Sequence, residues 1–119
     1  MHFEFANMDV YIAAVDFIVV ADQITERLPT GRAYLRDQTR RGANSIAANI
    51  AEGVGEFAAA DKARFYRIAR RSAVECASHV VVMDRLGLVD ADLREQAVEL
   101  LLRVIAMLTA MAKRVRARA

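Results

Sequence analysis

The sequence has few of the residues that interrupt helices or cross-link chains. Its 119 residues include one proline, five glycines, one cysteine and no tryptophan. A single cysteine excludes an intramolecular disulfide and a zinc site built from four thiolates. Apolar and polar residues nowhere alternate for long enough to predict a strand. Alanine, leucine and arginine, which are good helix formers, are abundant instead, so the composition favours long helices.

Long hydrophobic runs are also missing. The longest nearly apolar run, residues 10–21, is much shorter than the roughly 20 residues that a membrane span needs, and it contains Asp16. It also lacks the basic start and the small-residue cleavage site of a signal peptide. We therefore expect a soluble, cytoplasmic protein. Hydrophobic residues nevertheless make up 55% of the chain, which is more than the interior of one small bundle needs and indicates a subunit interface.

Four apolar segments separated by helix breakers predict four helices within one domain, residues 1–119. Pro29 and Gly31 follow the first segment, Gly87 follows the third, and Asp90 is a good N-cap for the fourth. Short connections between long helices predict an all-α, up-down-up-down four-helix bundle. Apolar residues surround almost the whole first helix and form two bands on the third. The expected helices span about residues 8–28, 33–52, 59–86 and 90–117.

One string, residues 53–58, matches the dinucleotide-binding pattern G-x-G-x-x-A. That loop needs a buried strand before its first glycine and a parallel sheet around it. Residues 41–52 have the pattern of a helix instead, so no cofactor is expected. We interpret Gly53 as a left-handed residue that ends the second helix, and Gly55 as part of the chain reversal.

Polar residues precede these glycines on one side of the second predicted helix. Ser45, Asn49 and Glu52 flank the apolar stripe that contains Ile46. We expect them to hydrogen-bond to a neighbouring helix or to the following turn, since buried polar groups need partners. The alternative is a polar site between helices.

The stretch RRGANSIAANIAEGVG resembles the signature of a family of four-helix-bundle proteins, some of which are encoded by intervening sequences within bacterial large-subunit ribosomal RNA genes. In that family a basic pair precedes Ser-Ile-x-x-Asn-Ile-Ala-Glu-Gly, and the next helix follows F-x-x-x-A-R-x-S-x-x-E. The matching residues are Arg40, Arg41, Ser45, Ile46, Asn49, Ile50, Ala51, Glu52 and Gly53, then Phe65, Ala69, Arg70, Ser72 and Glu75. The likeness extends over about residues 8–112.

The resemblance implies a left-handed bundle that assembles into a homopentameric ring and has no established enzymatic activity. A related branch, the accessory proteins of diversity-generating retroelements, is similar in its pentameric architecture and associates with nucleic acid and a reverse transcriptase. Many relatives carry basic residues just after the position of Gly53, where this chain has Gly55, Glu56 and a run of alanines. That departure argues against a nucleic-acid contact at this turn.

Candidate catalytic and metal-binding residues are few. Glu75, Cys76 and His79 share one helix, but the Glu-x-x-His pairs of di-metal bundles are absent. We expect His79 to be a hydrogen-bonded core or interface residue and Cys76 to be a small buried hydrophobe; a metal or redox site is the alternative. Asp16 and Asp22 are expected to pair with arginines of another helix or subunit. No catalytic residue, metal or cofactor is predicted.

Basic residues are unevenly distributed, although the formal net charge is only +2. Residues 62–71 hold five cations and no acid, and residues 113–118 hold four more cations. The candidate phosphate contacts, at helical spacing, are Arg32, Arg36, Arg40, Arg41, Arg64, Arg67 and Arg71. The leading hypothesis is a non-enzymatic pentameric scaffold or interaction protein. The alternative is an accessory protein that binds RNA or DNA phosphates through these arginines, alone or with a nucleic-acid-processing protein.

Overall fold

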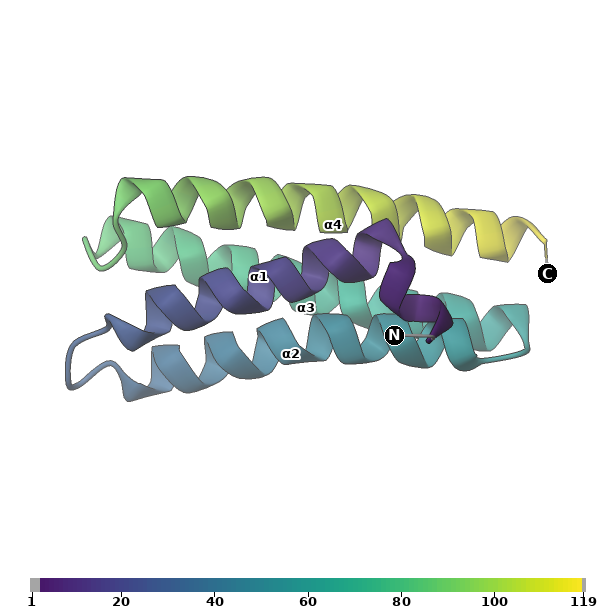
Figure 1. Cartoon of the computed structure of the whole chain (residues 1–119), viewed down its shortest axis with the longest axis horizontal. Helices are drawn as coiled ribbons and strands as arrows, with labels where there is room; N and C mark the ends of the chain where they lie inside the picture. The colour runs from purple at the N-terminus through teal and green to yellow at the C-terminus, as the bar shows by residue number, and fades with distance from the viewer. Residues whose placement is uncertain (1–2, 119) are drawn as a thin grey trace.

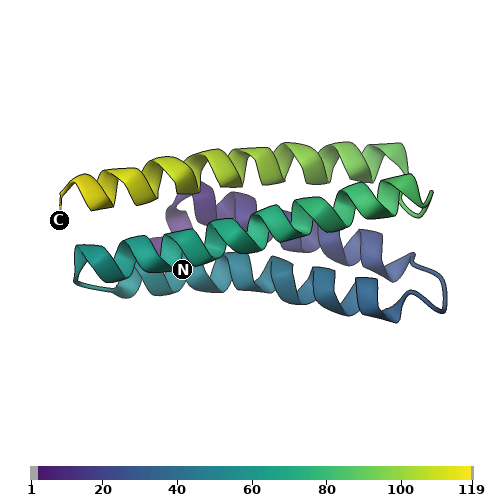
Figure 2. The same ribbon diagram turned by 180° about the vertical axis from the view of Figure 1, so that it is seen from behind.

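The computed structural model describes residues 3–118, which form a bundle of four long helices (Figure 1). Consecutive helices run in opposite directions in both views (Figures 1 and 2). No strand occurs in this part of the chain, so the prediction of an all-α four-helix bundle is confirmed. The elements are a short 3-10 helix η1 (Glu4–Asn7), then α1 (Asp9–Glu26), α2 (Ala33–Gly55), α3 (Ala59–Arg85) and α4 (Ala91–Ala117).

Each long helix packs against two others. α1 and α3 both lie beside α2 and α4, whereas the backbones of the diagonal pairs, α1 with α3 and α2 with α4, are not adjacent within residues 3–118. One core runs between the four helices, and each contributes side chains to it. Complete burial of a large apolar side chain contributes roughly 1.5–3 kcal/mol, so this shared core is the main reason that the helices associate. Fully buried examples are Phe17, Ile46, Ile50, Met83, Leu101 and Leu108.

The connection between α3 and α4 forms as the sequence predicts. Gly87 has a φ of +70°, and its N–H donates to the Asp84 carbonyl at 3.0 Å. The next N–H, of Leu88, donates to the Met83 carbonyl at 2.8 Å, which completes a Schellman motif. The Asp90 carboxylate then accepts from the Leu93 N–H at 3.0 Å and caps α4.

The prediction that Gly53 ends α2 is wrong. α2 continues to Gly55, and positive φ values occur in the described chain only at Gly31 and Gly87. A Cβ atom at Gly53 would lie 2.5 Å from Cε1 of Tyr66. This glycine is therefore present because the Tyr66 ring on α3 packs directly against the backbone of α2.

The two ends of the bundle carry different connections. The turn between α2 and α3 lies at the end where the chain finishes, and the α1–α2 and α3–α4 connections lie at the opposite end (Figure 1). The first half of α3 therefore lies beside the second half of α4 (Figure 2). None of the helices in residues 3–118 is long and apolar enough to cross a membrane.

Candidate functional site

The signature residues of α2 mostly make contacts inside the bundle. Ser45 Oγ lies 2.9 Å from Ser72 Oγ on α3, which confirms the expected hydrogen bond to a neighbouring helix. Asn49 Nδ2 donates to the carbonyl and hydroxyl oxygens of Ser45 at 2.8 and 3.0 Å. Ile46 and Ile50 are fully buried in the core.

Two glycines allow α2 and α3 to approach closely at either side of these serines. A Cβ atom at Gly42 would lie 2.8 Å from Cys76 Sγ, just as one at Gly53 would meet Tyr66. Side chains at these positions would overpack the interior, which typically costs about 1–3 kcal/mol. We call this set the α2/α3 contact: Gly42, Ser45, Asn49, Gly53, Tyr66, Ser72 and Cys76.

A shallow polar groove of ≈ 340 Å³ lies outside the α2/α3 contact. Its charged side chains are Arg41 and Glu75, both exposed. Because their charges have opposite sign, the groove has little net attraction for a charged ligand. Glu52, the remaining polar residue of the signature, is exposed to solvent.

Two arginines of α2 are engaged by the end of α1. Arg36 donates to the carbonyl oxygens of Thr25 at 3.3 Å and Leu28 at 3.1 Å. Arg40 donates to the buried Thr25 hydroxyl at 2.8 Å and lies 3.6 Å from Asp22, which confirms the predicted pairing of that carboxylate. A helix end leaves carbonyls without intrahelical partners and carries partial negative charge, so these cations stabilise it. Their engagement leaves them poorly placed as phosphate contacts.

The other predicted phosphate contacts separate into several environments. Arg32 is half-buried at the start of α2, whereas Arg41 is exposed in the polar groove. The Arg64 guanidinium lies 4.7 Å from the ring centre of Phe65, a cation–π contact. Arg67 and Arg71 instead line a groove between α3 and α4.

α3 and α4 enclose a groove of ≈ 380 Å³ whose polar side chains are nearly all cationic. Arg70, a signature residue, crosses it and donates from Nε to Thr109 Oγ1 at 2.7 Å. Within residues 3–118 no carboxylate lies within ion-pair distance of its five cations. We call it the basic groove; it is lined by Arg67, Arg70, Arg71, Val74, Thr109, Ala112, Lys113 and Arg116.

The α4 half of the basic groove was not among the predicted contacts. Lys113 and Arg116 belong to a basic run that is visible in the sequence, but the run alone does not show which helix it faces. The antiparallel packing of α3 and α4 brings residues 62–74 beside residues 100–118. These two segments contain five cations each and no acid.

Glu75, Cys76 and His79 lie in different environments on α3, exposed, buried and half-buried in turn. Cys76 is completely buried, and burial, with a smaller contribution from the Glu75 charge, raises the pKa of its thiol to about 12. His79 Nε2 lies 3.7 Å from Glu75 Oε1, too far for a hydrogen bond. His79 Nε2 has no other hydrogen-bond partner in the described chain, so the hydrogen bond expected of His79 is not present at Nε2. No three potential ligands in residues 3–118 lie close enough together to hold a metal.

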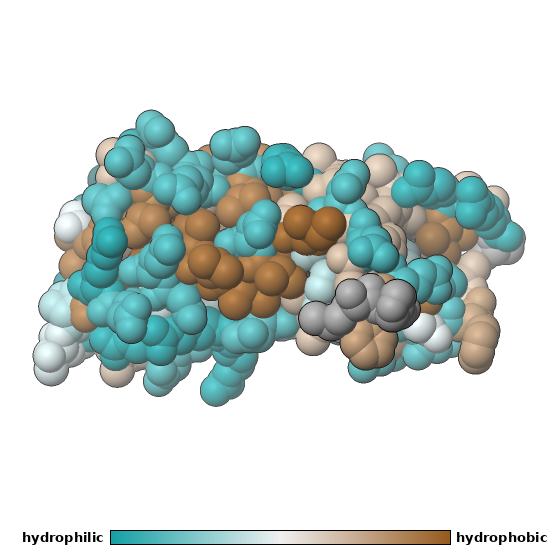
Figure 3. Space-filling model, viewed as in Figure 1, coloured by the Kyte–Doolittle hydropathy of each residue, from teal (hydrophilic) through white to brown (hydrophobic). Residues whose placement is uncertain are grey.

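Apolar side chains remain exposed on the outer side of α1. Ile12 is 46% and Val19 is 52% exposed, and they lie two helical turns apart on one face. Figure 3 shows hydrophobic residues gathered over the middle of α1, surrounded by hydrophilic ones. We call Ile12 and Val19 the α1 surface.

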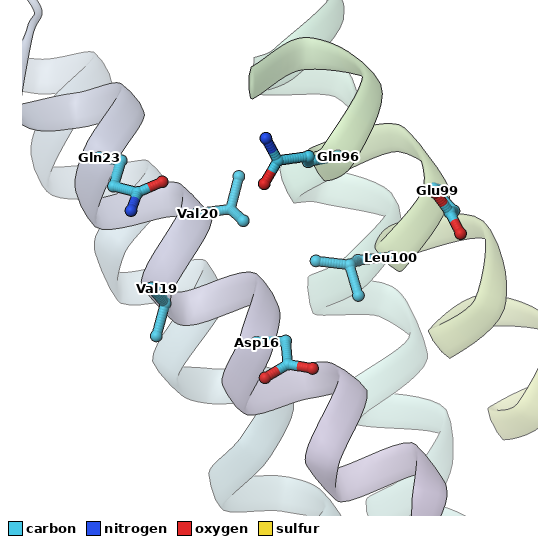
Figure 4. A pocket seen from close by; sticks show the side chains of 7 residues that line it. All are labelled: Asp16, Val19, Val20, Gln23, Gln96, Glu99 and Leu100. Carbon is cyan, nitrogen blue, oxygen red and sulfur yellow. The ribbon is translucent and has the colours of Figure 1, made fainter. Parts of the chain in front are cut away.

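A cleft of ≈ 390 Å³ separates the α1 surface from α4. Gln96 and Leu100 point from α4 toward α1, and Asp16 and Val20 lie opposite them (Figure 4). Asp16 has no ion-pair partner within residues 3–118, so the predicted pairing of Asp16 with an arginine of the same subunit does not occur there. The cleft presents amide and carboxylate groups around an apolar floor.

A second apolar surface lies between α3 and α4, on the far side of α4 from that cleft. Val81 is 60% and Leu102 is 64% exposed there. The groove that they border has a volume of ≈ 130 Å³. We call it the apolar groove; it is lined by Ala77, Val80, Val81, Val98, Leu101, Leu102 and Ile105.

Comparison with known proteins identifies the family of this chain. No curated protein matches this chain. A family model described as 23S rRNA-intervening sequence protein matches residues 6–110, which include all of the signature on α2 and α3. Together with the four-helix architecture, this match shows that the chain belongs to the 23S rRNA-intervening sequence protein family.

Proposed function

We propose that this protein is a non-enzymatic subunit of a homo-oligomeric ring that serves as a scaffold or interaction module. The observation that carries the proposal is the presence of two separate apolar surfaces, the α1 surface and the apolar groove. A ring closes when each subunit uses two different surfaces, one for each neighbour. The family resemblance implies that the ring has five subunits.

The two surfaces suit such a contact energetically. Each exposes branched apolar side chains, and burial of apolar area contributes about 25 cal/mol per Å². The α1 surface projects outward, whereas the apolar groove is concave, so the side chains of α1 can insert between α3 and α4 of the next subunit. Exposed apolar patches of this kind mark interaction sites on proteins.

Substitutions at each surface test this arrangement. Val19→Asp places a charge in the α1 surface, and Leu102→Asp places one at the apolar groove. Because both positions are already more than half exposed, we expect both variant subunits to stay folded. We expect each variant alone to have the 13.2 kDa mass of a single chain. A mixture of the two is expected to form a heterodimer, since each variant keeps the surface that the other lacks.

The control is Tyr34→Asp, which changes an exposed apolar residue of α2 outside both surfaces. It is expected to leave the assembly intact. If Val19→Asp or Leu102→Asp alone forms a dimer, each surface pairs with its own copy and the ring arrangement is incorrect. Light scattering coupled to gel filtration measures all four samples.

A second candidate function is nucleic-acid binding, and the basic groove specifically favours it. A ring would repeat the groove in every subunit, so a modest patch becomes an extended cationic surface that attracts phosphates. The family description names 23S rRNA, which makes structured RNA the first ligand to test. Salt-titrated binding of a labelled RNA hairpin is the experiment, and absence of binding at about 50 mM salt would remove this function.

A further inference from the structure

We infer that the basic groove is a binding site for the phosphodiester backbone of a nucleic-acid strand, with Arg67, Arg71 and Lys113 as phosphate contacts. The inference rests on the second candidate function and assigns it to the face between α3 and α4. It moves the site away from α2, because Arg36 and Arg40 are already held by the end of α1.

The cations of the basic groove form two rows that face each other. Arg67 and Arg71 lie one helical turn apart on α3, about 6 Å along the axis. Lys113 and Arg116 lie three residues apart on α4 and occupy the opposite wall. In both rows the cations lie about one helical turn apart, which is comparable to the separation of successive phosphates along a strand. Each row can therefore contact consecutive phosphates. The apolar floor, Val74 and Ala112, supports the aliphatic parts of these side chains.

One member of the groove is fixed in place before any ligand binds. Thr109 Oγ1 donates to the Ile105 carbonyl at 2.8 Å and accepts from Arg70 Nε at 2.7 Å. The bond uses one donor of the guanidinium and leaves its terminal N–H groups available for an anion. An arginine that is already oriented loses less side-chain entropy when it binds.

The half of the α3/α4 pair that contains the basic groove has no acidic residue to balance its cations. Residues 62–74 and 100–118 carry ten cations and no acid. The opposite half, residues 75–99, contains six acids and two arginines, and there Arg94 pairs with Asp84 at 3.0 Å. Like charges one turn apart on a helix destabilise it, so the ten cations cost stability that a polyanion would recover.

The test compares two triple variants that lose the same charge. Arg67→Ala/Arg71→Ala/Lys113→Ala changes the basic groove, and Arg32→Ala/Arg41→Ala/Arg85→Ala changes cations outside it. Binding of labelled single-stranded RNA, an RNA hairpin and single-stranded DNA is measured by fluorescence anisotropy between about 50 and 200 mM salt. Circular dichroism and the mass of the assembly show that both variants keep the fold and the oligomeric state.

We expect the groove variant to bind at least about tenfold more weakly at 50 mM salt, and its salt slope to fall by about 2–3, the contribution of three phosphates. The control variant is expected to stay within about threefold of the unchanged protein. Equal losses in both variants would overturn the assignment to the groove and leave nucleic-acid binding standing. No binding by the unchanged protein would remove the nucleic-acid function itself. Binding of polyglutamate as tightly as RNA would show an acidic protein partner and also overturn the inference.

Discussion

α2 and the α3/α4 face use the same kinds of residue in opposite ways. On α2, Arg36 and Arg40, Ser45 and Asn49, and Gly42 and Gly53 have partners inside the subunit, such as the end of α1, the serine of α3 and the Tyr66 ring. On the α3/α4 face, the arginines of the basic groove have no carboxylate partner in the described chain, and valines and a leucine remain exposed. Most of the family-signature residues on α2 therefore hold the helices together, whereas the basic groove, which includes the signature residue Arg70, lies between α3 and α4.

The largest expected effect is a difference in stability between two pairs of arginines with the same spacing. One pair is Arg36 and Arg40 on α2, and the other is Arg67 and Arg71 on α3. Arg36→Ala/Arg40→Ala removes hydrogen bonds to the Thr25 and Leu28 carbonyls and the Thr25 hydroxyl. Hydrogen bonds from charged groups contribute about 1.5–3 kcal/mol when well buried, and these are partly exposed. We expect the free energy of unfolding to fall by about 2–3 kcal/mol in urea titrations.

Arg67→Ala/Arg71→Ala is the matched control for that pair. It removes two arginines four residues apart that have no carboxylate partner in residues 3–118. Stability is expected to change by less than about 0.5 kcal/mol. Equal losses for the two pairs would mean that the contrast between α2 and the α3/α4 face does not exist. Both are measured at one protein concentration, because assembly contributes to apparent stability.

A smaller effect is expected from the glycines of α2. Alanine is a better helix former than glycine by up to about 1 kcal/mol, so Gly53→Ala would stabilise an isolated helix. In the protein its Cβ meets Tyr66 Cε1 at 2.5 Å, and we expect a net loss of about 1–2 kcal/mol in thermal or urea unfolding. Gly55→Ala, which meets nothing within 4 Å, is expected to be neutral or stabilising. A stabilised Gly53→Ala variant would contradict the close contact.

The serine pair between α2 and α3 is expected to contribute about 1 kcal/mol. Ser45→Ala removes the partner of Ser72 and one acceptor of Asn49. Ser78→Ala, at an exposed position of α3, provides the comparison and should leave the denaturation midpoint unchanged. If the two variants unfold at the same urea concentration, the serine pair has no part in joining the helices.

The smallest effect concerns salt. Repulsion among the cations of the basic groove weakens as ions screen it, so raising salt from about 50 to 300 mM should stabilise the protein by a few tenths of a kcal/mol. The Arg67→Ala/Arg71→Ala variant should show a flatter response in thermal unfolding. Identical salt responses would show that these cations do not repel one another.

The parts of the fold that depend on neighbouring residues along the chain could be predicted from the sequence. Gly87 and Asp90 end and begin helices through bonds to residues within a few positions of them, and both predictions are confirmed. The prediction that Gly53 ends α2 is wrong because this glycine accommodates Tyr66, which lies on another helix. Its spacing to Gly55 contains no information about that ring.

The candidate site was predictable only in part for the same reason. Both basic runs are visible in the sequence, but the register of α3 against α4 decides that Arg67 and Lys113 share a groove. The same spacing occurs at Arg36 and Arg40, where the end of α1 supplies partners. Periodicity places arginines on one face of a helix, and only the packing shows what lies opposite that face.

The mass of the unchanged protein in solution tests the central proposal most directly. Light scattering coupled to gel filtration, at micromolar concentration and moderate salt, should give about five times the 13.2 kDa of one chain. In the proposed ring, neighbouring subunits cover the α1 surface and the apolar groove, which the single subunit leaves exposed. A mass near 13.2 kDa would contradict the account, because both surfaces would then remain open to water.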